Sequence, residues 1–201
     1  GVVAGYEVAI RAMEYLCSSE AIRYPPLPPS RPYHSTGTGA AYGAAAAAAK
    51  LFGCNQEQIA MALGVTAAHT PMSRPYQIPT SGHMIKECIG WAGLTGVEGA
   101  YLAKHGFIGP NTLFDDKEAR GTSVDTIGSS FEILNNYFKP YPACRVTHAA
   151  LDATLSLIKQ HSLTADEIVR VKVMVRKNDL ALSSPRPVSI EQAQYSFPFV
   201  I

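Results

Sequence analysis

The chain has 201 residues, of which 47% are hydrophobic and only 16% charged, so it carries enough apolar sequence to form a globular core. Its formal net charge at pH 7 is +1, which argues against a nucleic-acid binder or a protein held on an anionic membrane, because both need a basic surface. The four cysteines are far apart and lack the spacing of a zinc site. We therefore expect no metal centre, and scattered cysteines favour the reducing cytoplasm.

Both ends of the sequence are apolar. Residue 1 is Gly, and no basic region precedes an apolar one as it would in a signal peptide. The longest apolar run, residues 40–49, is too short and too rich in alanine to span a membrane. The chain begins within an apolar helical pattern and stops at "YSFPFVI", without capping or stop signals. We therefore expect an internal segment of a longer protein.

Helical patterns dominate the first two thirds of the sequence. Proline-rich stretches, "CSSEAIRYPPLPPSRP" and "HTPMSRPYQIPTSGH", interrupt the patterns and cannot be helical. Asn55 is a good N-cap for one helix, and Gly53 and Gly106 are good residues to follow the end of two others. The predicted helices cover about 2–17, 36–52, 55–68 and 83–105.

The last third of the sequence mixes helical and extended patterns. "FEILNNYFKPYPAC" predicts a strand that runs into a proline turn, and a helix follows at about 145–161. "IVRVKVMVRK" alternates valines with mostly basic residues, the pattern of a β-strand with one apolar face. A last helix is predicted after Ser189. The fold class is therefore mainly α, with a large helical domain at 1–137 followed by part of a smaller α+β domain at 138–201.

The stretch "YHSTGTGAAYG" predicts a helix start that could bind a small anion. Its glycines resemble a dinucleotide fingerprint, but the preceding residues are proline-rich and form no strand, which disfavours a phosphate loop. Thr36 and Thr38 offer hydroxyls, and Gly37 and Gly39 would let a ligand approach the backbone N–H groups. His34 could donate to a carboxylate or exchange a proton. The alternative is a capped helix with a structural histidine.

Lys86 is a second candidate, on the predicted helix 83–105. A lysine on an apolar, small-residue face at the positive end of a helix would be partly desolvated, which makes it a plausible base or carboxylate partner. The alternative is a lysine at the edge of a core face, with its stem buried and its ammonium group in water. The residues that share its predicted face are Ile89, Gly93, Gly96 and Ala100.

"KPYPACRVTH" is the third candidate. Pro140 keeps Lys139 out of a helix, and Cys144 and His148 fall at the start of the next helix, where anions are favoured. The alternatives are a cysteine nucleophile, for which no orienting group is evident, and a rigid connector between domains. Arg74, in the proline-rich loop before Lys86, could also face a ligand.

Five stretches together resemble one family of enzymes. They are "GYEVAIRA", "YHSTGTGAAYGAAAAAAKLFG", "GHMIKECIGWAGLTGVEGAYLAKHGFIGP", "FKPYPACRVTHAALDA" and "SIEQAQYSFPFVI". Their content and order are similar to the MmgE/PrpD family, which includes 2-methylcitrate dehydratase, cis-aconitate decarboxylase and iminodisuccinate epimerase. The resemblance extends over essentially the whole chain.

The resemblance implies a homodimeric enzyme without metal or cofactor, acting on a small di- or tricarboxylate between a helical domain and a lid domain. His34, Lys86 and Lys139 match the family's catalytic positions, whereas Cys144 stands where the decarboxylase branch has histidine. Family members are more than twice as long, and an upstream segment rich in Asp and His supplies further active-site residues.

We therefore expect a hydro-lyase similar to 2-methylcitrate dehydratase, with little activity in these 201 residues alone. Thr36, Thr38, Arg74, Cys144 and His148 are its predicted substrate-binding residues. The alternatives are an epimerase or a decarboxylase of the same family, or an inactive binding or dimerisation module.

Overall fold

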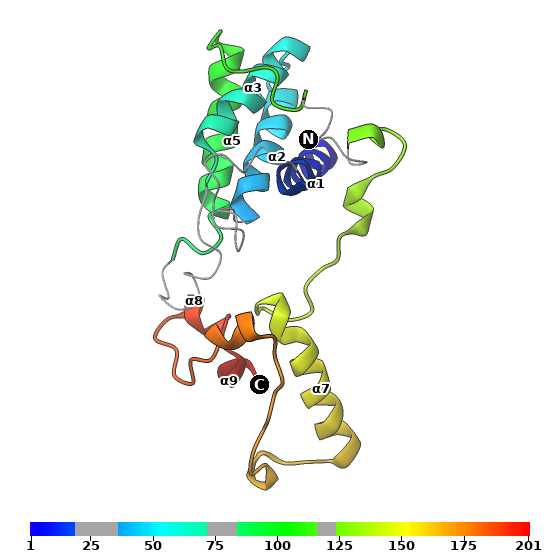
Figure 1. Cartoon of the computed structure of the whole chain (residues 1–201), viewed down its shortest axis with the longest axis vertical. Helices are drawn as coiled ribbons and strands as arrows, with labels where there is room; N and C mark the ends of the chain where they lie inside the picture. The colour runs from blue at the N-terminus through cyan, green and yellow to red at the C-terminus, as the bar shows by residue number, and fades with distance from the viewer. Residues whose placement is uncertain (19–35, 72–83, 116–123) are drawn as a thin grey trace. The chain divides into compact units, whose positions relative to one another are not determined.

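The computed structural model describes residues 1–18, 36–71, 84–115 and 124–201 (Figure 1). The chain divides into two compact units. The first comprises the described parts of 1–75 and 87–136, and the second those of 76–86 and 137–201. None of the helices in the described segments is long and apolar enough to cross a membrane.

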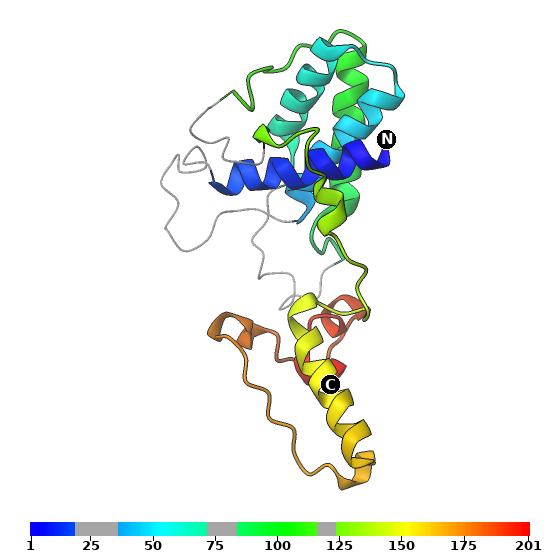
Figure 2. The same cartoon turned by 90° about the vertical axis from the view of Figure 1, so that its right-hand side faces the viewer.

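Helix α2 is the centre of the first unit. It packs against α1, α3 and α5, and α3 also packs against α5. Figure 2 shows α1, in blue, running across the direction of the other three helices. A short 3-10 helix, η2, lies against α1. The bounds of these elements are α1 Val2–Ser18, α2 Thr36–Leu51, α3 Gln56–His69, α5 Ile89–Lys104 and η2 Glu132–Asn135.

Small residues form the contacts around α2. A Cβ atom added to Gly43 would overlap the carbonyl oxygen of Gly5 on α1, and one added to Gly96 on α5 would overlap the carbonyl oxygen of Ala41. The helix backbones are therefore in direct contact, which larger residues would prevent. The face predicted for α5 is thus buried at Gly96 and Ala100. Ile89 is 50% exposed, and a Cβ atom added to Gly93 would meet no described atom within 4 Å. Ala41, Ala45, Ala49 and Ala100 are completely buried.

The helices at 2–17, 36–52, 55–68 and 145–161 are confirmed to within one or two residues. The Asn55 cap of α3 is a full capping box. Its side chain accepts from the backbone N–H of Gln58 at 2.9 Å, and the Gln58 side chain accepts from the backbone N–H of Asn55 at the same distance. Sequence reasoning succeeds here because the capping signal is local.

The predicted start of helix 83–105 is wrong, because α5 begins only at Ile89. Residues 84–87 form a turn, and Lys86 and Cys88 have left-handed backbones with φ of 49° and 60°. Glu87, the last residue of this turn, contacts the start of α2, where the N–H of Gly37 donates to its carbonyl oxygen at 2.8 Å. A tertiary contact therefore overrides a helical sequence pattern.

The second unit is built on helix α7, which has 17 residues. The described residues contain no β-strand, so the mainly α class is confirmed, while the predicted strand within 168–176 is wrong. That segment has no ladder partner in the described chain, and a strand forms only where a neighbour accepts and donates backbone hydrogen bonds. The elements are α7 Arg145–His161, η3 Ala165–Glu167, η4 Lys177–Ala181, α8 Ile190–Ala193 and α9 Phe197–Val200.

The strand predicted from "FEILNNYFK" is also wrong, because Glu132–Asn135 form the 3-10 helix η2. The amide of Asn135 donates to the Glu132 carboxylate at 3.0 Å, and the amide of Asn136 donates to the carbonyl oxygen of Ile133 at 3.2 Å. Such short-range side-chain bonds stabilise turns in competition with extended structure.

A buried arginine joins α1 to the segment that precedes the second unit. Arg11 is only 5% exposed. Its guanidinium donates to the Thr126 hydroxyl at 2.8 Å, to the carbonyl oxygen of Ser130 at 2.9 Å and to the Glu7 carboxylate at 3.1 Å. Burial raises the pKa of Glu7, but the backbone N–H groups of Ile133 and Glu132 and the Arg11 guanidinium outweigh burial and lower the pKa below its ordinary 4.5.

Gly96→Ala is expected to destabilise the chain by about 2 kcal/mol, because the added methyl group overlaps the backbone of α2 and forces it to move. Gly93→Ala on the same helix is the matched control. It meets no atom and should stabilise by up to about 1 kcal/mol, because alanine favours helix over glycine. Urea unfolding of the 201-residue chain measures both changes. Equal midpoints for the two variants would contradict direct contact between the helix backbones.

Glu7→Gln is expected to lower the melting temperature of the chain at pH 7 by about 2–4 °C, or roughly 1 kcal/mol for a protein of this size. A carboxyl with a lowered folded-state pKa stabilises above its unfolded pKa of 4.5, and this contribution is lost as the pH falls through the folded value. The difference between the two proteins should therefore shrink below about pH 4.5. Glu14→Gln changes an exposed carboxyl of the same helix and should have little effect at any pH. A difference that persists at low pH would refute the role of the Glu7 charge.

Candidate functional site

The second unit contains a small cavity at the start of α7. Its volume is about 210 Å³. The backbone N–H of Cys144 donates to the carbonyl oxygen of Gln194 at 2.7 Å, which fixes the start of α7 to the residue that follows α8. The cavity is lined by Lys139, Pro142, Ala143, Cys144, Gln194 and Tyr195.

Gln194 connects this cavity to Lys86. The Lys86 ammonium donates to Gln194 Oε1 at 2.7 Å, across 108 positions of sequence. Two of the predicted catalytic residues, Lys86 and Lys139, and the predicted substrate-binding residue Cys144 are therefore brought to one place around Gln194. The two lysines belong to the same compact unit despite their separation in sequence.

Sequence reasoning missed Gln194. It stands in the apolar stretch "AQYSFPFV", which indicates a core. The signal that could have found it is its place directly after α8, whose N-terminus is capped by the Ser189 hydroxyl. The backbone N–H of Gln194 donates to the carbonyl oxygen of Ile190 at 3.1 Å, so the local turn holds the backbone of this polar residue.

The cavity has the electrostatic character of an anion site. Lys139 lines it directly, and Cys144 both lines it and precedes the first residue of α7, so the positive end of the α7 dipole adjoins it. Cys144 makes no side-chain capping bond. The described residues that line it include no carboxylate. A carboxylate ligand would therefore meet positive charge from Lys139 and from the helix end.

The predicted setting of Lys86 needs correction. Lys86 does not lie on a helix, because α5 starts three residues later, so it shares no helical face with Gly93 and Gly96. Its left-handed backbone, with φ of 49°, is uncommon for a residue with a side chain. The Lys86 backbone is part of a turn, and the hydrogen bond to Gln194 positions its half-buried side chain.

His148 lies on the first turns of α7 but does not line the small cavity. It is 8% exposed, its Nε2 is 3.1 Å from the carbonyl oxygen of Ala143, and its ring meets the Tyr141 ring edge-on at 5.3 Å. The His148 ring therefore packs against the turn that precedes α7. The substrate-binding role predicted for His148 stays a prediction.

Thr36 and Thr38 belong to the first unit, at the start of α2. The Thr36 hydroxyl donates to the Glu87 carboxylate, and the buried Thr38 hydroxyl donates to the carbonyl oxygen of Pro71 at 2.6 Å. Both hydroxyls thus have protein acceptors, and their substrate-binding role also stays a prediction.

The reason proposed for Gly37 and Gly39 is wrong in this structure. A Cβ atom on Gly37 would lie 2.7 Å from the carbonyl oxygens of Glu87 and Cys88, and one on Gly39 would overlap the Met13 side chain. The space that these glycines leave is filled by other parts of the chain. They permit close packing around α2.

His34 and Arg74 lie outside the described residues. Among the residues that the structure describes, no three histidine, cysteine, aspartate or glutamate side chains gather closely enough to hold a metal ion.

Comparison with known families accounts for most of the chain. Residues 1–132 match the sequence model of the MmgE/PrpD N-terminal domain, and residues 141–201 match that of the MmgE/PrpD C-terminal domain.

The chain belongs to the MmgE/PrpD family.

The order of the two domains is that of the motifs recognised in the sequence, so the family resemblance is confirmed. A similar curated MmgE/PrpD protein is the cis-aconitate decarboxylase of Homo sapiens, which is 27% identical over 185 residues. The match covers 84% of this chain and 37% of the human protein.

All the residues that line the cavity fall within the match to the MmgE/PrpD C-terminal domain except Lys139, which precedes that match. Lys86, which contacts Gln194, falls within the N-terminal match. Residues from both sequence matches therefore meet within one compact unit.

Proposed function

We propose that this chain is part of a lyase that removes a proton next to a carboxylate of a small di- or tricarboxylate. The observation that carries the proposal is the cluster of Lys86, Gln194 and Lys139 at the start of α7. Two cations beside a helix N-terminus suit a substrate with more than one carboxylate. Membership of the MmgE/PrpD family supports the same chemistry.

In the proposed reaction, the two lysines neutralise the substrate carboxylates. A proton next to a carboxylate is weakly acidic, and its removal puts negative charge on the carboxylate oxygens, which fixed cations stabilise. The carbon–hydrogen bond breaks, its electron pair forms a carbon–carbon double bond, and the neighbouring hydroxyl leaves as water after accepting a proton. We assign the proton transfers to His34, which matches the family's histidine.

The reaction that we favour is dehydration, of the type catalysed by 2-methylcitrate dehydratase. Decarboxylation is the second candidate, because the human relative is a cis-aconitate decarboxylase. Cys144 argues for dehydration, because the decarboxylase branch is expected to have histidine at this position. Product analysis distinguishes the two, since dehydration of 2-methylcitrate releases water and decarboxylation of cis-aconitate releases carbon dioxide.

We further propose that residues 1–201 act within a longer polypeptide, because they match only 37% of the human relative. The 201-residue chain alone should then show little or no turnover of either substrate, whereas the complete gene product should be active. If the complete product were also inactive on every di- and tricarboxylate tested, a binding or dimerisation module would be the better reading. A reaction without metal or cofactor stays a prediction from the family resemblance.

Lys86→Ala in the complete gene product is expected to reduce kcat/KM by at least about 100-fold, the usual scale for a group that stabilises the charge of a transition state. Gln194→Leu keeps the charge of Lys86 but removes the acceptor of its hydrogen bond. That bond is worth about 1.5 kcal/mol, so the expected loss is roughly tenfold. Steady-state kinetics with 2-methylcitrate measures both.

The control is Lys50→Ala, which removes an exposed lysine from the last turn of α2 and should leave kcat/KM unchanged. The thermal melting of all three variants is compared with that of the unsubstituted protein, so that a folding defect is separated from a catalytic one. Turnover close to normal in a folded Lys86→Ala protein would refute the assignment.

We also propose that the complete protein is a homodimer, with α5 in the interface. The small face of α5 is already used inside the unit, but its other face carries a stripe at helical spacing that is 46–58% exposed. An exposed apolar stripe of this kind is typical of a protein interface. Its residues are Trp91, Leu94, Val97 and Tyr101.

Leu94→Glu should convert the complete protein to monomers in light scattering at micromolar concentration, because it places a charge in the apolar contact. Leu155→Glu, at a similarly exposed leucine on α7, should leave the dimer intact. A monomeric unsubstituted protein, or a Leu94→Glu protein that remains dimeric, would contradict the proposed interface.

A further inference from the structure

Residues 139–144 carry the lysine and the cysteine of the small cavity to the start of α7. Pro140 and Pro142 lie in this segment and have no backbone N–H group, so backbone hydrogen bonds cannot hold the segment at these two positions. Cys144, its last residue, donates its backbone N–H to the carbonyl oxygen of Gln194 at 2.7 Å. Side chains of α7 supply further contacts to the same segment.

His148 on α7 makes the first of these contacts. Its Nε2 lies 3.1 Å from the carbonyl oxygen of Ala143, and because a carbonyl oxygen can only accept, this nitrogen carries the hydrogen and donates. His148 is 8% exposed and does not line the small cavity, whereas Ala143 does. The histidine therefore acts on the cavity through the backbone of a residue that lines it.

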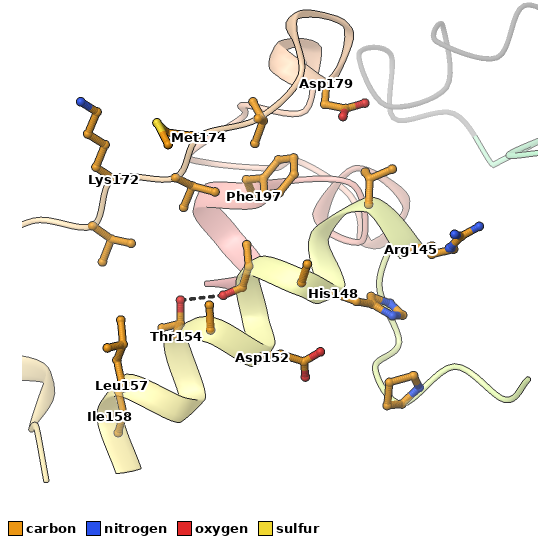
Figure 3. A pocket seen from close by; sticks show the side chains of 18 of the residues that line it. Arg145, His148, Asp152, Thr154, Leu157, Ile158, Lys172, Met174, Asp179 and Phe197 are labelled. Atoms are coloured by element: carbon orange, nitrogen blue, oxygen red, sulfur yellow. Dashed lines mark hydrogen bonds between the residues drawn. The ribbon is translucent and has the colours of Figure 1, made fainter. Parts of the chain in front are cut away.

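Asp152, also on α7, makes the second contact. It accepts a hydrogen bond from the Tyr141 hydroxyl at 2.5 Å, and this bond raises the pKa of Tyr141. Asp152 lies four residues after His148, about one helical turn, so both side chains project from the same side of α7 toward residues 139–144 (Figure 3). The rings of Tyr141 and His148 also meet edge-on, with 5.3 Å between their centroids. One face of α7 thus holds the segment at two neighbouring places.

The place of Lys139 depends on these contacts. Its side chain is exposed and lines the cavity. A long exposed side chain keeps many rotamers, so the backbone that carries it decides which region its charge can reach. A misplacement of about 1 Å is enough to weaken catalysis strongly. The backbone of residues 139–144 must therefore stay against α7 for Lys139 to meet a substrate carboxylate.

We propose that His148 and Asp152 are positioning residues of the candidate site. They hold residues 139–144 against α7 and so place Lys139 for a substrate carboxylate, while neither side chain contacts the substrate. This inference rests on the proposed function, because it concerns the same cavity.

The test compares two amide variants of His148 in the complete gene product. The side-chain nitrogen of His148→Gln is as many bonds from Cα as Nε2 and can still donate to the carbonyl oxygen of Ala143, whereas that of His148→Asn is one bond shorter and cannot reach it. Hydrogen exchange of residues 139–144, followed by mass spectrometry, should be about tenfold faster in His148→Asn and nearly unchanged in His148→Gln.

Steady-state kinetics with 2-methylcitrate then shows whether the segment affects the site. His148→Asn should raise KM and reduce kcat/KM by about tenfold, and His148→Gln should restore most of both. The rise in KM is the informative result, because a smaller folded fraction lowers the apparent kcat without changing KM.

Asp152→Ala removes the other contact from an exposed side chain, so it should fold even if a His148 variant does not, and it should change exchange and KM in the same direction as His148→Asn. His161→Leu is the matched control. It removes an exposed histidine from the last turn of α7 and should change neither measurement.

Two results with an active unsubstituted protein would overturn the proposal. Faster exchange of residues 139–144 with an unchanged KM would mean that the segment does not place Lys139. A raised KM with unchanged exchange would instead make His148 a direct substrate ligand. If the unsubstituted protein turns over no di- or tricarboxylate, the proposed function fails first, and this inference fails with it.

Discussion

Direct contact between backbones around α2 is the constraint on which the first unit depends. α1 and α5 both reach the α2 backbone at glycines, Gly5 against Gly43 and Gly96 against Ala41. The missing side chain of Gly37, at the start of α2, likewise leaves room for the carbonyl groups of Glu87 and Cys88. Glu87 directly follows Lys86, whose backbone is left-handed.

In the second unit, Gln194 has a comparable role on a smaller scale. Its backbone oxygen accepts from Cys144, the residue before α7, and its side-chain oxygen accepts from Lys86. One residue therefore links a lysine from the N-terminal family match to a cavity that is lined mostly by residues of the C-terminal match. A single hydrogen bond to an ammonium group contributes only about 1.5–3 kcal/mol, but it fixes where the charge lies when a carboxylate arrives.

Sequence reasoning predicts the elements that are specified by neighbouring residues. The capping box at Asn55 and the Ser189 cap are examples, because both signals lie within one turn of the helix that they start. It fails at Ile89, where the helix start is decided by a contact with α2 from far away in the sequence. It also fails at 168–176, where the alternating pattern is strand-like but no described segment supplies the hydrogen bonds of a ladder.

In the candidate site, too, local features are predicted from the sequence and long-range contacts are not. Lys86, Lys139 and Cys144 are found from the residue types and the family resemblance, but the reason first given for Lys86, a helical face, is wrong. Gln194 is missed because its importance lies in a contact across 108 positions, which no local pattern encodes. For Gly37 and Gly39, the sequence indicates a close approach correctly, but the approaching group is another part of the chain.

A core of alanine and glycine also influences how the first unit responds to temperature and to mutation. Alanine loses no side-chain rotamer freedom on folding and buries little surface per residue. Because the heat capacity of unfolding rises with the apolar surface that is exposed, this unit should have a smaller value per residue than a core of leucine and phenylalanine, and a flatter stability curve. A substitution that shortens the side chain of Ala41, Ala45 or Ala49 removes at most one methyl group, whereas a larger side chain there must displace a helix. This core therefore tolerates substitution by residues as small as alanine or glycine, but it does not tolerate larger residues.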